Sequence, residues 1–305
     1  AQEAGGDVLV ANTSGFTRSD PVLWPGQLEA GEALVDEHGV PLMTQTTARG
    51  TWIAPVDLPP FTVQALRRQP GSAPQPADPV IAEIGLLENA YLRVEFDEAG
   101  DICRIFDKTR ERDVLPPGTV ANQMQAFEDR PMNWDAWDID IFYDDKQWLA
   151  EPATSVRVIE AGPVRAALEI ERRILNSSYT QRVSLAYNSA RLDIETVIDW
   201  HERHVLLKAA FPVDVLSPSA TYEIQWGNTE RPAHRNTSWD WARFETCAQK
   251  WIDLSEGDYG VSLLNGCKSG HDIHGNVMRV SRLRSPTSPD PYAAQGQHRF
   301  TLSLY

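Results

Sequence analysis

Residues 91–106 read YLRVEFDEAGDICRIF and predict an antiparallel β-hairpin. Apolar and polar residues alternate on both sides of Asp97-Glu98-Ala99-Gly100, and the glycine that ends this segment suits a tight turn. Similar alternation recurs downstream in residues 155–160, 164–174, 180–187, 191–200, 205–211 and 221–226. Strands of this kind have one apolar and one solvated face, which favours an all-β protein of packed antiparallel sheets.

A proline-rich stretch divides the chain. Residues 69–79, QPGSAPQPADP, contain four prolines, and proline lacks the backbone donor that a sheet interior needs. We therefore expect a linker at 69–79, a small β module at 1–68 and a larger β domain at 80–305. Short strand-like runs separated by turn residues support the small module.

Residues 239–254 do not follow the strand period. Trp241, Phe244 and Ala248 recur three and seven residues apart, which is a helical spacing, whereas the aromatic composition suits a strand. Periodicity alone leaves the choice between helix and strand open.

The charge balance excludes some classes of partner. The 305 residues carry a formal net charge of -15, so the chain lacks the basic surface that nucleic acid or an anionic membrane requires. A neutral partner such as a sugar is compatible with this charge. No apolar run approaches the roughly 18 residues that would span a bilayer.

Cysteine usage indicates a cytoplasmic protein. The three cysteines, Cys103, Cys247 and Cys267, are odd in number and far apart, unlike a disulfide framework or a zinc site. We expect reduced, buried thiols. The first residues, AQEAGGDVLV, have neither the basic nor the long apolar region of a signal peptide.

The most unusual local composition lies at residues 127–145, FEDRPMNWDAWDIDIFYDD. Indole rings stack on the C–H faces of sugars, and carboxylates accept hydrogen bonds from sugar hydroxyls. If residues 137–143 form a strand, Trp137 and Tyr143 share one face and Asp138 lies on the other. The alternative is an acidic, solvated loop with buried anchoring tryptophans. A glycosidase also needs paired carboxylates, but any acid-rich loop would supply candidates.

Two histidine pairs are poor candidates for a metal site. His201 and His204, like His271 and His274, are three residues apart, and residues so spaced in a strand point to opposite faces. We expect turn histidines with local hydrogen bonds, and no metal site. The sequence also contains no G-x-S-x-G, Gly-rich phosphate loop or Cys-x-x-Cys motif.

Three blocks together resemble the C-terminal part of glycoside hydrolase family 38, the α-mannosidases, and most of all its cytosolic and bacterial branch. The first block is 88–115, ENAYLRVEFDEAGDICRIFDKTRERDVL, and the second is 125–143, QAFEDRPMNWDAWDIDIFY. The third begins with DWHERHVLLKAAFP at 199–212 and continues through 236–270 to 283–305. The resemblance covers nearly the whole chain.

The resemblance implies a fold and a place within a larger enzyme. Family members have an N-terminal (β/α) barrel with a zinc ion and an aspartate nucleophile, then a helical bundle, then β-sandwich domains. The chain corresponds only to the last part, so we expect no catalytic residue, metal or cofactor within it, and zinc in the missing barrel. The fold implied is a small Ig-like β-sandwich followed by a galactose-mutarotase-like super-sandwich, truncated at its C-terminus, with residues 242–254 in a strand.

The resemblance also implies a function. The parent enzyme would hydrolyse terminal α-linked mannose with retention of configuration, and this part would support and help line the mannose site. Its partners would be its own barrel and a mannose-containing oligosaccharide. The substrate-proximal candidates are Trp134, Asp135, Trp137 and Asp138, with anchoring at the domain interface as their alternative role. Ser269, Arg282 and Ala294 depart from the family pattern, which weakens any role in substrate contact for the last loops.

Two other functions remain open. An aldose-epimerase-like enzyme would need a histidine acid and a carboxylate base in one cleft, for which His234 or His298 could serve with Glu223. A free-standing carbohydrate-binding module is the second alternative.

Overall fold

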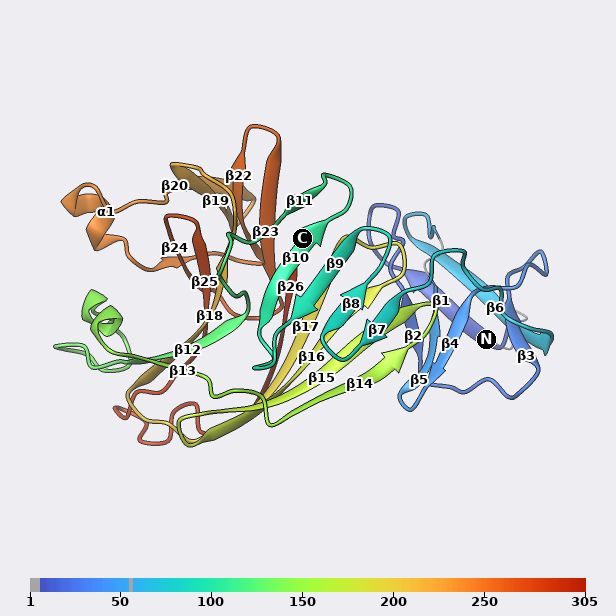
Figure 1. Cartoon of the computed structure of the whole chain (residues 1–305), viewed down its shortest axis with the longest axis horizontal. Helices are drawn as coiled ribbons and strands as arrows, with labels where there is room; N and C mark the ends of the chain where they lie inside the picture. The colour runs from blue at the N-terminus through green and yellow to red at the C-terminus, as the bar shows by residue number, and fades with distance from the viewer. Residues whose placement is uncertain (1–5, 55–56) are drawn as a thin grey trace.

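The computed structural model describes residues 6–54 and 57–305, and nearly all of its regular structure is antiparallel β-sheet (Figure 1). Two three-stranded sheets, in the orders β1-β6-β3 and β2-β5-β4, form the small N-terminal module. Their strands are β1 (Val8–Asn12), β2 (Val22–Trp24), β3 (Glu32–Val35), β4 (Thr44–Thr47), β5 (Gly50–Ile53) and β6 (Thr62–Pro70). Buried side chains from both sheets, including Val10, Leu34 and Ile53, make a core of their own, so the module is a sandwich.

Three larger sheets follow. The first has the order β11-β10-β9-β8-β7, the second β13-β12-β18-β25-β24-β21, and the third β14-β15-β16-β17-β26-β23-β22-β19-β20. The strands of the first sheet are β7 (Ile81–Glu83), β8 (Leu86–Glu88), β9 (Leu92–Phe96), β10 (Ile102–Asp107) and β11 (Arg112–Asp113). Those of the second sheet are β12 (Gln123–Glu128), β13 (Gln147–Leu149), β18 (Val205–Pro212), β21 (Thr246–Cys247), β24 (Gly270–His274) and β25 (Val277–Arg284).

The third sheet is the longest. Its strands are β14 (Ser155–Ala161), β15 (Arg165–Ile174), β16 (Ser177–Ala186), β17 (Leu192–Trp200), β19 (Ser219–Ile224), β20 (Gly227–Pro232), β22 (Trp251–Glu256), β23 (Tyr259–Asn265) and β26 (Gly296–Leu304). The helical elements are the 3-10 helix η1 (Ile141–Asp145) and the short helix α1 (Ser238–Ala242). The predicted all-β class of packed sandwiches is therefore confirmed.

The hairpin predicted from residues 91–106 is present as β9 and β10, which pair from Ile102↔Phe96 to Asp107↔Leu92. Gly100 in its turn has φ +80°, a conformation that favours glycine. A Cβ atom there would also lie 2.8 Å from the Cβ atom of Ala153. The turn therefore needs glycine both for its backbone and for its close packing.

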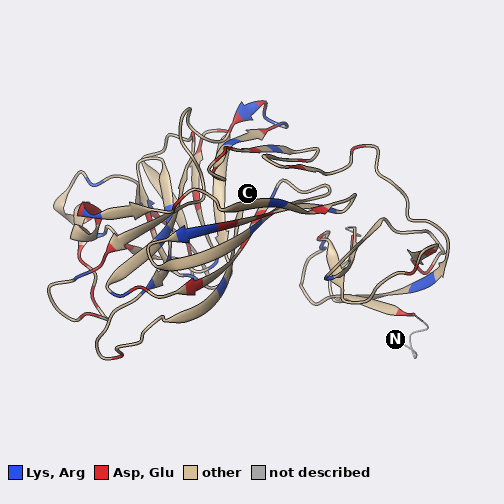
Figure 2. Ribbon diagram, turned by 60° about the horizontal axis from the view of Figure 1, so that its bottom comes forward, with Lys and Arg blue, Asp and Glu red and all other residues tan. Residues whose placement is uncertain are grey.

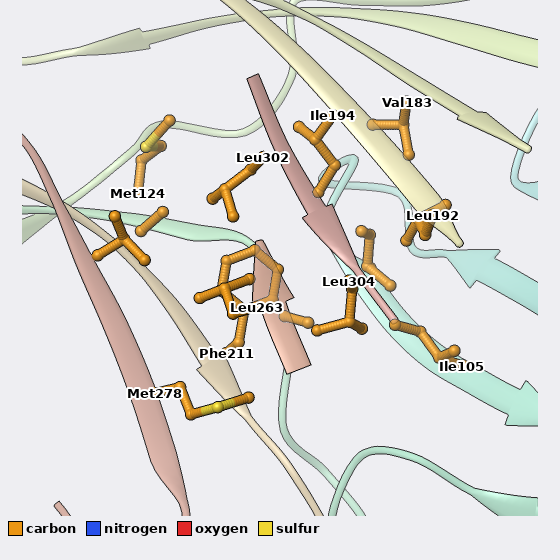
Figure 3. Packing of buried hydrophobic residues seen from close by; sticks show 14 of the residues in the cluster. Ile105, Met124, Val183, Leu192, Ile194, Phe211, Leu263, Met278, Leu302 and Leu304 are labelled. Carbon is orange, nitrogen blue, oxygen red and sulfur yellow. The ribbon is translucent and has the colours of Figure 1, made fainter. Parts of the chain in front are cut away.

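One continuous core joins the three large sheets. Inward side chains from all of them meet in it, and Figure 3 shows Phe211 beside Leu263, with Leu304 between this pair and Ile105. Burying one such side chain contributes about 1.5–3 kcal/mol. On the outer face charges of both signs are interspersed (Figure 2), as in the pair of Arg157 and Glu169 at 2.7 Å. The period-two alternation thus separates the core from the solvated face.

The small module packs against the start of β15, at Arg165. The side-chain amide of Gln45 donates to the carbonyl oxygen of Arg165 at 2.9 Å, and its oxygen accepts from the amide of Arg165 at 2.7 Å. The guanidinium group of Arg165 lies 4.9 Å from the ring centre of Trp52. Buried polar contacts therefore fix the module at this end of the large sheet.

The expected linker begins later than predicted. β6 extends to Pro70, which pairs with Glu32 of β3, so Gln69 and Pro70 belong to a strand. Proline is tolerated there because β1 pairs with β6 only as far as Leu66, which leaves an edge. Residues 71–79 have no strand or helix.

Residues 239–254, for which periodicity left helix and strand open, contain both a short helix and strands. Helix α1 begins after Thr237, whose hydroxyl accepts from the amide of Asp240 while that carboxylate accepts in return, a capping box. Strand structure follows at Thr246–Cys247 and from Trp251. The strand expected at 242–254 is therefore correct at 246–247 and 251–254 only.

The cysteines differ from expectation. Cys103, Cys247 and Cys267 are free but exposed, so the prediction of buried thiols was wrong. Cys103 lies at an irregularity in the pairing of β9 with β10, between Ile102 and Arg104, which turns its side chain outward. Among the described residues, no helix is long and apolar enough to cross a membrane.

Candidate functional site

The segment singled out by composition forms the long loop between β12 and β13. It lies at the end of the molecule remote from the small module (Figure 1). Residues 137–143 are not a strand, because η1 starts at Ile141. Tyr143 in η1 is buried, and its ring packs edge-on against Phe127 at 5.2 Å. Trp137 and Tyr143 therefore do not lie on one face of a strand, as they would if residues 137–143 were extended.

Arg284, the last residue of β25, holds this loop in place. Its Nε donates to Oδ2 of Asp129 at 2.5 Å, and its Nη2 donates to the carbonyl oxygens of Asp135, at 3.0 Å, and Asp138. Asp129 is 1% exposed, and this burial raises the pKa of its carboxyl even though Arg284 opposes the rise. One side chain thus closes the loop by binding its start and its middle.

Asp135 anchors the loop from the other side. Its Oδ2 accepts from the amides of Thr287 at 2.8 Å and Ser288 at 3.0 Å, and its Oδ1 lies 3.5 Å from Nδ1 of His204. Burial opposes ionisation, but the hydrogen bonds from Thr287 and Ser288 outweigh it and hold the pKa of Asp135 below its ordinary value. Asp135 therefore has a structural role, because its carboxylate oxygens already interact with Thr287, Ser288 and His204.

Trp134 and Trp137 face the solvent. Each is 72% exposed, so the alternative of buried anchoring tryptophans is wrong within this chain. Trp134 has φ +60°, and its carbonyl oxygen accepts from the amides of Trp137 at 2.7 Å and Asp138 at 2.9 Å. A bulky residue in the left-handed region is strained, and such strain concentrates at functional positions. The strained backbone at Trp134 is therefore part of the turn that holds these two rings outward.

Asp138 is exposed, and its carboxylate accepts a hydrogen bond from the next amide in the chain, that of Ile139, at 2.9 Å. The four predicted residues therefore lie in one turn but differ in role. Trp134, Trp137 and Asp138 face outward, where rings can stack on a sugar or an apolar surface and a carboxylate can accept from a hydroxyl. Asp135 positions them.

Sequence reasoning missed a second aromatic segment, at α1. Trp239 is 74% exposed and Trp241 is 47% exposed, and α1 lies at the same end of the molecule as the β12–β13 loop (Figure 1). We call the exposed side chains of both segments the aromatic face: Met132, Trp134, Trp137, Phe142, Trp239 and Trp241. The signal was the SWDW motif at 238–241, which repeats the pairing of tryptophan with aspartate.

Behind this face lies a buried lysine that sequence reasoning also missed. Lys208 is 0% exposed, and its Nζ donates to the hydroxyl of Tyr143 at 2.8 Å, to Asp272 at 2.7 Å and to Glu245. Asp272 is bound in turn by Arg279, whose Nη2 lies 2.7 Å from Oδ2. The signal was a lone charge in VLLKAAF at 205–211, an otherwise apolar strand.

The environment shifts the pKa values of Lys208, Asp272 and Tyr143 in this network. Burial lowers the pKa of Lys208 to about 8, although Asp272 favours its charged form. Burial opposes ionisation of Asp272 too, but Lys208 and Arg279 hold its pKa below the ordinary value. Burial, together with the nearby Asp272, raises the pKa of Tyr143. The network is therefore ionic in Lys208, Asp272 and Arg279 at neutral pH, with a neutral phenol.

The histidine pairs do not act as pairs. Nε2 of His201 lies 2.9 Å from Asp199, and Nε2 of His204 lies 3.0 Å from the hydroxyl of Thr287. His271 and His274 both lie in strand β24, and His271 is buried, so their expected place in a turn was wrong. In residues 6–54 and 57–305, no group of three or more His, Cys, Asp and Glu side chains could hold a metal ion.

The residues proposed for epimerase chemistry are engaged separately. The Glu223 carboxylate accepts from the amide of Lys250 at 2.6 Å. Nδ1 of His234 lies 3.7 Å from Asp240, and Nε2 of His298 lies 2.8 Å from the carbonyl oxygen of Ala294. These contacts give neither histidine a role as the acid partner of Glu223.

Comparison with known proteins shows that the chain is similar to part of longer proteins. It is 36% identical over 299 residues to mouse alpha-mannosidase 2C1, covering 97% of this chain and 27% of that protein. It is 39% identical over 226 residues to alpha-mannosidase G of Dictyostelium discoideum, covering 72% of this chain and 21% of that protein. The chain thus spans about a quarter of the length of these relatives.

A solved structure supports the fold. The crystal structure of an alpha-mannosidase from Enterococcus faecalis superimposes with a TM-score of 0.77 at 15% identity, over 97% of this chain and 42% of that one. The family described as glycosyl hydrolases family 38 C-terminal domain matches residues 87–292, which include the β12–β13 loop and α1. On the family match and the identity to these relatives, the chain belongs to glycosyl hydrolase family 38 and contains its C-terminal domain.

Proposed function

We propose that this chain is the non-catalytic C-terminal part of an α-mannosidase that hydrolyses terminal α-linked mannose with retention of configuration. The observation that carries the proposal is the turn that holds Trp134 and Trp137 outward at 72% exposure, fixed by Arg284 and Asp135. Relatives that bear the name alpha-mannosidase, at 36–39% identity, support the substrate class.

The chemistry would lie in a preceding catalytic barrel. Retaining glycosidases need a nucleophilic carboxylate and an acid about 5–5.5 Å apart, and the anchored Asp135 is not free to serve as either. Zinc, which the resemblance implies, would be bound in that barrel and orient the sugar hydroxyls. The aromatic face would meet the barrel beside the mannose site, where Trp134 and Trp137 exclude water and stack on the sugar, and Asp138 accepts from a hydroxyl.

The first test uses the isolated chain. We expect no release of nitrophenol from p-nitrophenyl α-D-mannoside, with or without added ZnCl2, and no stoichiometric zinc by atomic absorption. Turnover that survives EDTA would contradict the proposal. Micromolar binding on a glycan array in the absence of a barrel would favour a free-standing carbohydrate-binding module instead.

The second test uses the longer enzyme. Trp137→Ala should lower kcat/KM for a mannoside by roughly two- to twelvefold, since an aromatic stacking contact contributes about 0.5–1.5 kcal/mol. Trp226→Ala is the matched control, because this tryptophan is also exposed but lies in the turn between β19 and β20. Equal effects of the two substitutions would show that the β12–β13 loop is not part of the mannose site.

We also propose a cytoplasmic location. Three free, exposed cysteines suit a reducing compartment, where thiols are not oxidised to disulfides. Cell fractionation should find the protein with cytoplasmic markers, and recovery from a secreted or vesicular fraction would contradict this.

A further inference from the structure

Lys208 contacts three segments that are far apart in the sequence. It lies in the middle of β18, and its Nζ reaches the hydroxyl of Tyr143 in η1, the carboxylate of Glu245 after α1 and that of Asp272 in β24. Two of these segments, at η1 and α1, carry the aromatic face. The third belongs to the six-stranded sheet beneath them. Lys208 is therefore the point at which both surface segments meet the sheet.

Further contacts join the same two segments. The hydroxyl of Tyr143 donates to Glu245 at 2.8 Å, and the ring of Tyr143 lies 6.1 Å from that of Phe244. Asp144 of η1 binds Arg235, just before α1, at 3.3 Å. The β12–β13 loop and the α1 segment are thus joined by the same group of polar contacts.

The energetics favour a positional role over a stabilising one. An ion pair removed from water loses most of its attraction to desolvation, so an apolar side chain of similar size often serves stability as well. What a buried charge adds is directionality, since an ammonium group has three donors and each must find an acceptor. Lys208 has three acceptors, one from each segment.

We propose that Lys208 is a positioning residue that couples the β12–β13 loop to the α1 segment, so that the aromatic face responds as one unit to a change in either. The role of the aromatic face in a mannosidase rests on the proposed function, whereas the coupling depends only on contacts within this chain. A partner or sugar that contacts Trp137 would therefore also fix the segment that carries Trp239 and Trp241.

The coupling is tested by hydrogen exchange, read by mass spectrometry, on the chain of residues 1–305. Glu245→Gln removes a charge near α1, and we expect exchange in residues 139–146 of the other segment to rise by about tenfold. Tyr143→Phe should raise exchange in residues 237–247 by a similar factor. Glu223→Gln is the matched control, because it neutralises a half-buried carboxylate that binds the amide of Lys250, outside the network, and should change neither segment.

The role of Lys208 itself is tested by the combined variants. In Lys208→Met both segments should exchange faster, and adding Glu245→Gln should cause no further rise in residues 139–146. If Lys208→Met does not fold, Lys208→Gln, which keeps hydrogen-bonding groups without charge, takes its place. Changes confined to the mutated segment, or additive effects in the double variant, would overturn the coupling. The outcome does not depend on mannoside turnover, so it is separable from the proposed function.

Discussion

The carboxylate of Asp129 and the guanidinium group of Arg284 form an ion pair across the β12–β13 loop, with 2.5 Å between Oδ2 and Nε. Asp129 is 1% exposed, so its charge depends on this partner. Arg284 also binds the backbone of the turn that carries both exposed tryptophans. The pair therefore links a buried charge to the shape of the candidate site.

Removing Arg284 should loosen the turn and destabilise the fold. Arg284→Met leaves Asp129 buried without its cation, and breaking a buried pair in this way costs about 3–5 kcal/mol. Urea unfolding measures the loss. Arg203→Met is the control, because this exposed arginine should change stability by less than about 0.5 kcal/mol. Equal stability of the two variants would show that the pair is not structural.

Acid should release the turn through Asp135. The pKa of Asp135 is held below its ordinary value in the folded protein, so its stabilisation is present above the unfolded pKa of about 3.9 and is lost as pH falls through the folded value. Between pH 6 and pH 2.5, tryptophan fluorescence should report this loss in the wild type and much less of it in Asp135→Asn. The exposed Asp138→Asn should behave as the wild type does, and identical profiles for all three would refute the assignment.

The fold could be predicted from the sequence because its signals are local. Alternation with a period of two marked β9, β10 and the strands from β14 to β19, and Gly100 marked the turn of the first hairpin. Register and burial follow from that alternation wherever one face is apolar. The errors fell where the alternation was interrupted, as at Cys103, whose bulge turns a small apolar side chain outward.

The site could be predicted only in part, because its supports come from distant positions. Composition located Trp134 and Trp137, but Arg284 lies 149 residues from Asp135 and Lys208 lies 64 from Asp272. Nothing in the local pattern joins such pairs. A lone lysine within VLLKAAF was a visible conflict between burial and charge, and a conflict of this kind is an indication of function or fixed geometry.

Arg282 offers a test of an unpaired buried charge. It is 2% exposed, its Nε and Nη1 have no hydrogen-bond partner among the described residues, and its guanidinium carbon lies 5.0 Å from the ring centre of Phe300. Burial lowers the pKa of Arg282 to about 9. Arg282→Met should therefore raise the free energy of unfolding by about 1–4 kcal/mol. Arg299→Met, at an exposed position, should change it little, and a loss of stability in Arg282→Met would show that the guanidinium group is needed.

Lys208 should make stability depend on pH in the alkaline range, with a definite sign. The pKa of Lys208 is about 8 in the folded protein and about 10.5 in the unfolded chain, so between these values the unfolded chain holds the extra proton. The free energy of unfolding therefore rises with pH from about 8 to 10.5, by at most about 1.4 kcal/mol per pH unit, and is insensitive to this group below pH 8. Urea unfolding at pH 7, 8, 9 and 10 should show the rise in the wild type beyond that in Lys208→Met, because the subtraction removes contributions common to both, such as that of Arg282. A difference that stays flat, or falls, over this range would mean that Lys208 keeps an ordinary lysine pKa and that its burial is compensated fully by Asp272 and Glu245.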